Sequence, residues 1–146
     1  MALVSLPFRA GSPEHFGLIV EAMAGQPVYQ GYTLADVRRL VVPPVRLGQY
    51  RIWVDEETRR FAAFATWAWT DAAGWRRLCA EDERFQVGDW RSGMIPVVMD
   101  LVAPGRAVAV VARDLQAMFG DVEVRWTRSR IDGRRTDTHH AKGRAA

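Results

Sequence analysis

The sequence predicts a single α/β domain in which helices cover the faces of a mixed β-sheet, and three observations support this prediction. Two segments with alternating apolar residues, 49–54 and 60–69, flank a polar turn, as in an antiparallel hairpin. A nearly continuous apolar run, Met94–Ala103, is typical of a strand buried inside a sheet. A helical pattern and another alternating segment, 122–126, follow it. This strand–helix–strand unit extends the hairpin into a mixed sheet.

The first helix is expected after residues 1–11, which show no clear period. Ser12 is a suitable N-cap, Pro13 is a favourable first helical residue, and Gly25 ends the apolar repeat. A loop with two tyrosines, residues 26–32, follows this helix.

A second, shorter helix is expected from Thr33, which forms a capping-box pattern with Asp36. Its apolar face would contain Leu34, Val37 and Val41. Pro43-Pro44 is expected to end it, because proline interrupts the hydrogen bonds of a helix interior.

The later elements follow from similar patterns. Thr70 is expected to cap a helix that reaches Cys79, and a charged connection, residues 81–86, leads to the central strand. The next helix has one apolar face and closes at Gly120. That face is predicted to contain Val108, Val111, Ala112, Leu115 and Met118. We therefore predict one domain over residues 1–127 and a basic, flexible tail over residues 128–146.

Composition restricts the class of protein. A chain of 146 residues is long enough to bury one core, and no apolar run reaches the roughly 18 residues that span a membrane. The single cysteine, Cys79, excludes an internal disulfide framework and suits a reducing compartment. The N-terminus lacks a basic region before its short apolar stretch, so no secretion signal is expected. We expect a cytoplasmic protein.

Charge is uneven along the chain. The net charge is +3, and basic residues are concentrated in the last stretch of the chain. They are Arg125, Arg128, Arg130, Arg134, Arg135, Lys142 and Arg144. This segment is either a solvated tail or a surface for an acidic partner. Nucleic acid is not the expected partner, because no groove-reading motif or zinc-ligand spacing is present.

Asp100 is the main candidate for chemistry, because an isolated carboxylate inside an apolar strand is costly unless it is paired. Pro104, Gly105 and Arg106 begin the helix that follows, and a helix N-terminus offers free backbone N–H groups to a ligand. These three residues form either a simple turn or a cradle for a bound thioester.

Several residues resemble the signature of a known enzyme family. Gly88-Asp89-Trp90, Ser92-Gly93 and then Asp100 with Ala103-Pro104 match the RTX toxin-activating lysine acyltransferases. Gln49-Tyr50, Trp67 and the Ala24-x-x-Pro27 loop also match, and the resemblance covers about residues 16–124.

The resemblance implies an acetyltransferase-like (GNAT-like) fold and transfer of a fatty acyl group from acyl carrier protein to internal lysines of an RTX-type protoxin. The donor would be the 4′-phosphopantetheine thioester of the carrier, with no bound cofactor and no metal. It also implies self-association as a homodimer.

The family's two functional positions carry over differently. Its strand aspartate corresponds to Asp100. Its loop histidine corresponds to Tyr29 when the sequences are aligned without gaps through Ala24 and Pro27. A phenol is neutral at pH 7, so Tyr29 would protonate the departing thiolate rather than act as a base. Asp100 would bind the incoming lysine and accept its proton. A catalytically degenerate member, which binds carrier or protoxin without turnover, is the alternative.

Other candidate residues favour ordinary structural roles. His15 is expected on the surface, His139-His140 in the tail, and Cys79 as an inert side chain. Trp67 and Trp69 are core residues or the wall of an acyl pocket. A third hypothesis, a binding module for nucleic acid or an acidic protein, would depend on residues 128–146.

Overall fold

A six-stranded sheet forms the centre of the computed structural model, which describes residues 2–7, 9–80, 84–129 and 135–142. The strands lie in sequence order. They are β1 (Leu3–Ser5), β2 (Tyr50–Asp55), β3 (Phe61–Thr70), β4 (Ile95–Val102), β5 (Glu123–Ser129) and β6 (Arg135–Lys142). β4 and β5 run parallel, and the other neighbouring strands run antiparallel. The predicted mixed sheet is confirmed, with β4 inside it.

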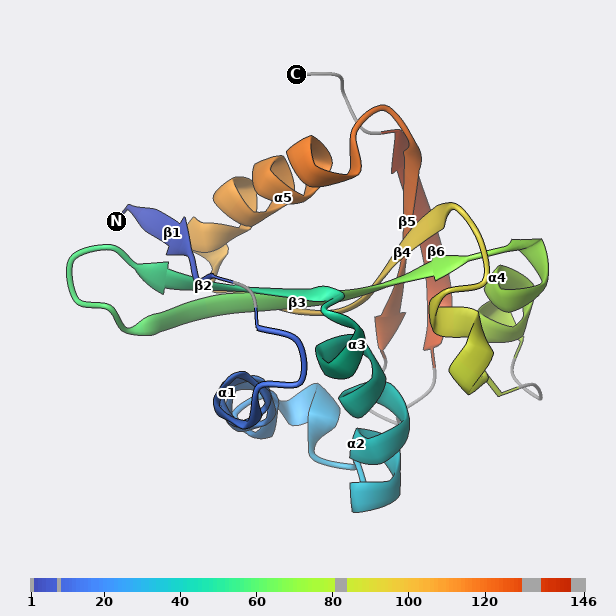
Figure 1. Cartoon of the computed structure of the whole chain (residues 1–146), viewed down its shortest axis with the longest axis horizontal. Helices are drawn as coiled ribbons and strands as arrows, with labels where there is room; N and C mark the ends of the chain where they lie inside the picture. The colour runs from blue at the N-terminus through green and yellow to red at the C-terminus, as the bar shows by residue number, and fades with distance from the viewer. Residues whose placement is uncertain (1, 8, 81–83, 130–134, 143–146) are drawn as a thin grey trace.

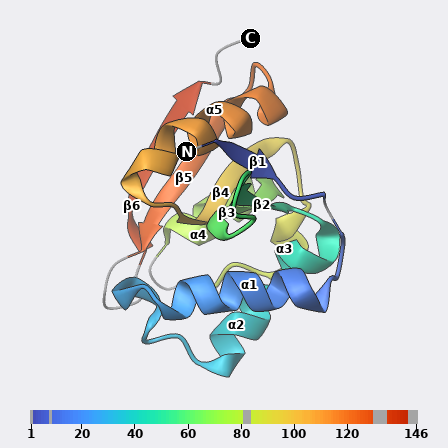
Figure 2. The same cartoon turned by 90° about the vertical axis from the view of Figure 1, so that its left-hand side faces the viewer.

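Helices cover both faces of this sheet (Figure 1). The helices are α1 (Pro13–Ala24), α2 (Leu34–Leu40), α3 (Val42–Leu47), α4 (Ala72–Cys79) and α5 (Gly105–Phe119). Two 3₁₀ turns are η1 (Pro27–Tyr29) and η2 (Val87–Trp90). Figures 1 and 2 show α1, α2 and α3 on one face and α5 on the other.

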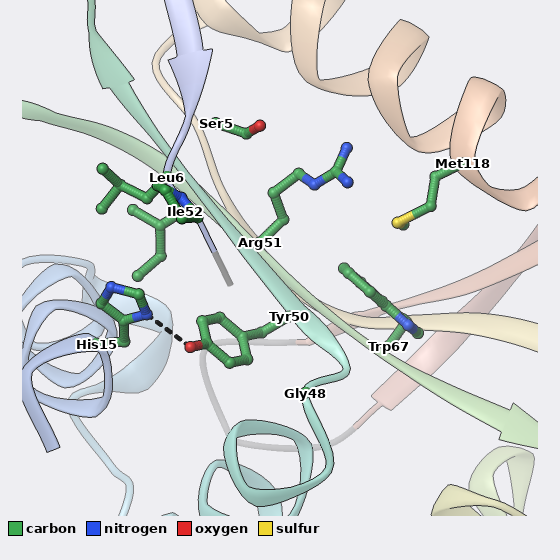
Figure 3. A pocket seen from close by; sticks show the side chains of 10 residues that line it. Ser5, Leu6, His15, Gly48, Tyr50, Arg51, Ile52, Trp67 and Met118 are labelled. Carbon is green, nitrogen blue, oxygen red and sulfur yellow. Dashed lines mark hydrogen bonds between the residues drawn. The ribbon is translucent and has the colours of Figure 1, made fainter. Parts of the chain in front are cut away.

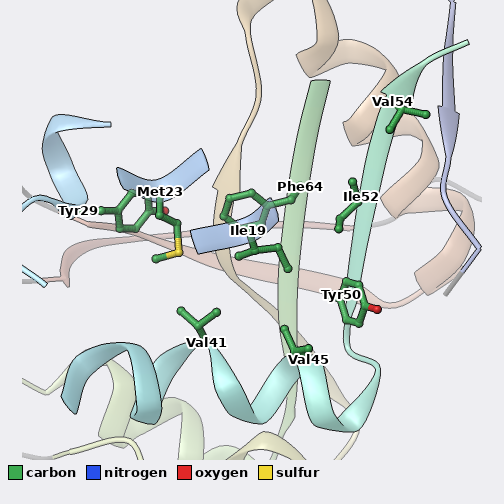
Figure 4. Close-up of a cluster of buried hydrophobic side chains, with 9 residues drawn as sticks. All are labelled: Ile19, Met23, Tyr29, Val41, Val45, Tyr50, Ile52, Val54 and Phe64. Atoms are coloured by element: carbon green, nitrogen blue, oxygen red, sulfur yellow. The ribbon is translucent and has the colours of Figure 1, made fainter. Parts of the chain in front are cut away.

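Successive side chains of the hairpin strands alternate between the two faces of the sheet, and so pack against the helices on each face. Tyr50, Ile52 and Val54 pack in a core with Ile19 of α1 and Val45 of α3 (Figure 4). On the other face, the side chains of β3 pack against α5. Those β3 residues are Ala63, Ala65 and Trp67. Period-two patterning therefore predicted the hairpin correctly.

The first two predicted helix starts are also confirmed. The Ser12 side chain accepts a hydrogen bond from the His15 backbone N–H, and Pro13 is the first residue of α1. Thr33 and Asp36 exchange hydrogen bonds in both directions, which completes the capping box of α2.

The second helix ends before Pro43-Pro44, as expected, but a further helix that was not predicted begins there. These prolines lie in the first turn of α3, where a missing N–H costs no helical hydrogen bond. Leu34, expected on the apolar face of α2, is 88% exposed. It is the first residue of a seven-residue helix and lies beyond the packed layer.

Three further expectations need correction. Residues 3–5 form β1, a strand too short to show a period in the sequence. Asp71 rather than Thr70 caps α4, since the Asp71 carboxylate accepts from the Gly74 N–H, while the Thr70 hydroxyl donates to the Ile95 carbonyl. The buried face of α5 contains Ala107, Val111, Leu115 and Phe119. Val108 and Ala112 are exposed.

The sheet continues beyond residue 127. β5 reaches Ser129, and the backbone of residues 135–142 pairs with it as β6. The division into residues 1–127 and a flexible tail stays a prediction, and residues 130–134 and 143–146 lie outside the described part.

The second half of β4 has an irregular register. Thr66 of β3 pairs with Asp100, but the next residue, Trp67, pairs with Val98. Met99 is therefore the extra residue of a β-bulge, a feature that re-aims neighbouring side chains. β4 pairs with β5 at Val97 and Val98, both before Asp100. Asp100 thus follows the stretch in which the two parallel strands are joined.

Candidate active site

Tyr29 and Asp100, which are 71 residues apart in the sequence, meet in the folded chain. The Tyr29 hydroxyl donates a hydrogen bond to Asp100 Oδ1 at 3.1 Å. Both side chains are buried. Two residues that the sequence analysis selected separately therefore form one polar pair in an apolar setting.

Local structure explains the position of Tyr29. Pro27 begins the η1 turn after α1, and this turn directs the Tyr29 ring into the core beside Ile19 and Met23 (Figure 4). The ring also packs edge-on against Tyr32, with 5.2 Å between their centroids. The phenol is thus held on its apolar sides while its hydroxyl reaches Asp100.

Asp100 projects from β4 immediately after the Met99 bulge, opposite Thr66. The next residue, Leu101, is exposed, as are Gln26 and Gln30 on either side of the η1 turn. The pair is therefore buried, but the chain on both sides of it reaches the surface.

α5 begins at Gly105, five residues beyond Asp100, with Pro104 as its N-cap. Pro104, Gly105 and Arg106 are exposed, and Pro104 supplies no side-chain cap to the helix. A Cβ placed on Gly105 would meet nothing within 4 Å. Packing within the described residues therefore does not require a glycine here.

The Gly88–Gly93 block, part of the family signature, has a structural role. Arg77 donates from Nε and Nη2 to the buried Asp89 carboxylate, which also accepts the Gln86 N–H. The hydrogen bonds from Arg77 lower the pKa of Asp89, so this carboxylate stays ionised. Asp89 thereby connects η2 to α4.

Ser92 and Gly93 fasten the same block to the end of β3. Ser92 Oγ accepts the Asp71 N–H at 2.9 Å. A Cβ on Gly93 would lie 2.6 Å from the Thr70 carbonyl oxygen and 2.7 Å from the Asp71 nitrogen, so the close approach of the two backbones requires glycine.

Gln49, which also matches the family signature, is buried and links two other segments of the chain by hydrogen bonds. Its Nε2 donates to the carbonyls of Trp67 and Trp90, at 3.0 Å and 2.9 Å. Both hydrogen bonds are internal, which indicates that Gln49 stabilises the scaffold.

His15 is not on the surface as expected. It is 8% exposed, and its Nδ1 lies 2.6 Å from the Tyr50 hydroxyl. That hydroxyl donates its proton to the Arg9 carbonyl, so the His15 Nδ1–H is the donor between the two rings. Burial raises the pKa of Tyr50. Sequence spacing could not reveal this contact, because its partners are 35 residues apart.

The His15–Tyr50 pair borders a pocket of about 430 Å³ beside the first residues of β2 (Figure 3). Arg51, Trp67 and Met118 line it toward α5, whereas His15 lines it toward α1. Trp67 is therefore a pocket wall as well as a core residue. Trp69 packs edge-on against Phe119, at 5.6 Å between centroids.

The remaining candidates do not join the Tyr29–Asp100 pair. Cys79 is half-buried in α4, and burial raises the pKa of its thiol. The side chains of His139 and His140 lie outside the described part. Within the described residues, no group of three histidine, cysteine or acidic residues could hold a metal ion. No helix in those residues is long and apolar enough to cross a membrane.

Comparison with known proteins adds one decisive observation. A sequence model of the RTX toxin acyltransferase family matches residues 9–140, which is most of the chain. The chain belongs to this family. The family resemblance seen in the signature residues is thereby confirmed, and the protein is a member of an acyltransferase family.

The other comparisons are more distant. The search of curated proteins found no match. A solved structure described as a histone acetyltransferase HPA2 and related acetyltransferase from Corynebacterium glutamicum is similar to this chain at 14% identity and a TM-score of 0.48. The match covers 90% of this chain and 80% of that one.

Proposed function

We propose that this protein transfers a fatty acyl group from acyl carrier protein to internal lysines of an RTX-type protoxin. Family membership supports acyl transfer to a toxin protein, and the carrier donor and lysine acceptor come from the resemblance of the signature residues. We further propose that the reaction occurs in the cytoplasm and that the enzyme forms a homodimer, as the resemblance implies.

The hydrogen bond between Tyr29 and Asp100 is the observation that carries this proposal. The residue at the family's histidine position still contacts the family's aspartate, although its chemistry has changed. A replacement that had merely lost its function would have no need to keep this contact. The pair therefore supports a working site with altered proton chemistry.

The proton transfers can be balanced with these two side chains. The lysine ammonium first releases one proton to solvent, since its pKa of about 10.4 leaves it protonated at neutral pH. The neutral amine attacks the thioester carbonyl, and Asp100 accepts the second proton from the attacking nitrogen. As the C–S bond breaks, the Tyr29 hydroxyl protonates the thiolate, and Asp100 returns its proton to the phenolate along their hydrogen bond.

The first turn of α5 fits the remaining requirement, stabilisation of the tetrahedral oxyanion. Gly105 and Arg106 are exposed at this helix N-terminus, and a helix N-terminus favours negative charge. Arg106 is exposed in the same turn and suits an acidic carrier protein.

The test is intact-mass spectrometry of an RTX-type acceptor incubated with this protein and acyl-loaded carrier protein. We expect acyl mass on the acceptor with the native protein and loss of most transfer in both Asp100→Asn and Tyr29→Phe. Tyr32→Phe is the matched control, because it removes a hydroxyl from the ring that packs against Tyr29. Native activity in both Asp100→Asn and Tyr29→Phe would refute the mechanism.

The replacement of histidine by Tyr29 favours one alternative, a degenerate member that binds carrier or protoxin without turnover. Tyr29→His separates the two functions. Transfer by Tyr29→His alone would identify a scaffold that has lost its base, whereas transfer by the native protein would exclude the degenerate member.

A further inference from the structure

Thr66 has a buried hydroxyl that no described residue uses. The side chain is 1% exposed, and among the described residues its Oγ1 has no hydrogen-bond partner. Leaving a buried hydroxyl unpaired costs free energy, and valine has nearly the same shape without that cost. The hydroxyl therefore opposes stability and needs another explanation.

The position of Thr66 supplies one. Thr66 pairs directly with Asp100 across β3 and β4, and directly opposed residues of an antiparallel pair project from the same face. The register changes immediately after this pair, at the Met99 bulge. The hydroxyl thus lies beside the carboxylate that Tyr29 contacts from the η1 turn.

We propose that Thr66 is a positioning residue for Asp100, whose hydroxyl donates a hydrogen bond to the carboxylate when substrate is bound. Rotation about one side-chain bond brings Oγ1 toward its cross-strand neighbour. Tyr29 then holds the carboxylate from η1 and Thr66 holds it from β3, which fixes the oxygen that accepts the lysine proton. This inference rests on the proposed acyl transfer.

The test compares Thr66→Val, Thr66→Ser and the matched control Thr70→Val. Thr70 is a buried threonine of the same strand, but its hydroxyl donates to the Ile95 carbonyl. Thr66→Val should lower kcat at least tenfold with little change in KM, and should keep or raise Tm by about 3 °C. Thr66→Ser should restore most of kcat. Thr70→Val should lower Tm and leave kcat unchanged.

A double-mutant cycle with Asp100→Asn tests whether Thr66 acts through Asp100. Thr66→Val should cause no further loss of rate in Asp100→Asn. Its Tm shift, measured with acyl-loaded carrier protein present, should differ between the two backgrounds. Native kcat in Thr66→Val, or additive losses in the double variant, would overturn the proposal.

The same four proteins separate failure of this inference from failure of the proposed function. Absence of transfer by the native protein would refute acyl transfer under these conditions. The comparison of Tm shifts would then test whether Thr66 contacts Asp100. It would also be the test if the rate of Asp100→Asn were too low to measure. Non-additive Tm shifts with acyl-loaded carrier protein present support the Thr66–Asp100 contact, and additive shifts under the same conditions overturn it.

Discussion

Asp89 and Asp100 are two buried aspartates of one signature, and their surroundings differ. Asp89 is held by the Arg77 guanidinium and the Gln86 N–H, and these contacts keep its pKa low. Asp100 accepts a hydrogen bond from the Tyr29 hydroxyl and pairs across the strands with Thr66, whose hydroxyl has no partner among the described residues. The ion pair of Asp89 connects η2 to α4 and so serves the fold, whereas Asp100 contacts the residue at the family's histidine position.

The comparison teaches that a family signature contains residues with separate tasks. Residues 88–93 brace the end of β3 against α4, whereas Asp100 and the start of α5 belong to the proposed reaction site. Substitutions in residues 88–93 should therefore lower the stability of the fold, and substitutions at Asp100 should lower the rate of acyl transfer.

The largest expected effect is on the rate of Asp100→Asn. Loss of a group that accepts a proton should lower kcat by about 10²–10⁴-fold. The fold should persist, because an amide of the same shape can still accept the Tyr29 hydrogen bond. Single-turnover mass spectrometry and thermal unfolding measure the two quantities. A near-native rate would contradict a catalytic role for Asp100.

Gly93→Ala should have the largest effect on stability. Its Cβ would lie within 2.8 Å of three backbone atoms of Thr70 and Asp71, none of which can move without disturbing β3. We expect a loss of roughly 3 kcal/mol in the free energy of unfolding, measured by urea denaturation. Gly88→Ala is the control, since a Cβ there meets nothing within 4 Å. Equal stability of the two variants would show that the backbone contact is unimportant.

Asp89→Asn should cost about 2–3 kcal/mol at neutral pH, because it leaves Arg77 without its anionic partner. The pKa of Asp89 is lowered in the folded state, so its contribution to stability is present above the usual value of 3.8 and is lost as the pH falls through the lower, folded value. Denaturation curves of native and variant proteins should therefore converge at acidic pH. A constant difference between them down to acidic pH would contradict this account.

Gly105→Ala should have the smallest effect on stability. It also tests most directly whether the start of α5 serves the reaction rather than the fold. Alanine is the better helix former by about 0.5–1 kcal/mol, and the site has room for its methyl group. Unfolding should therefore show unchanged or slightly higher stability. If the thioester approaches the backbone here, the acyl-transfer rate falls despite this. A native rate would assign Pro104, Gly105 and Arg106 to a simple turn.

Local patterns predicted much of this molecule. The Ser12 cap, the Thr33–Asp36 capping box and the hairpin depend on residues close in sequence, so their physics is visible in short segments. Pro43-Pro44 was misjudged, because the same residue can end one helix or begin another, and only the packed chain decides which.

The site was predictable in its parts but not in its arrangement. Asp100 is conspicuous as an acid in an apolar strand, and the resemblance indicated Tyr29. The sequence could not show that the two touch, that Thr66 lies opposite Asp100, or that His15 is buried against Tyr50. Each contact joins segments at least 34 residues apart, and so depends on tertiary packing.

Because of the Met99 bulge, the proposed site depends on the register in which β4 pairs with β3. Side chains of a strand alternate between faces, so a slip of one residue would exchange Asp100 for Met99 or Leu101 beside Thr66. The Ser92–Gly93 contacts with Asp71 and Thr70 fix where β4 begins relative to β3. Insertions or deletions between residues 94 and 99 should therefore be tolerated far less than substitutions, because they would move the acid to the opposite side of the sheet.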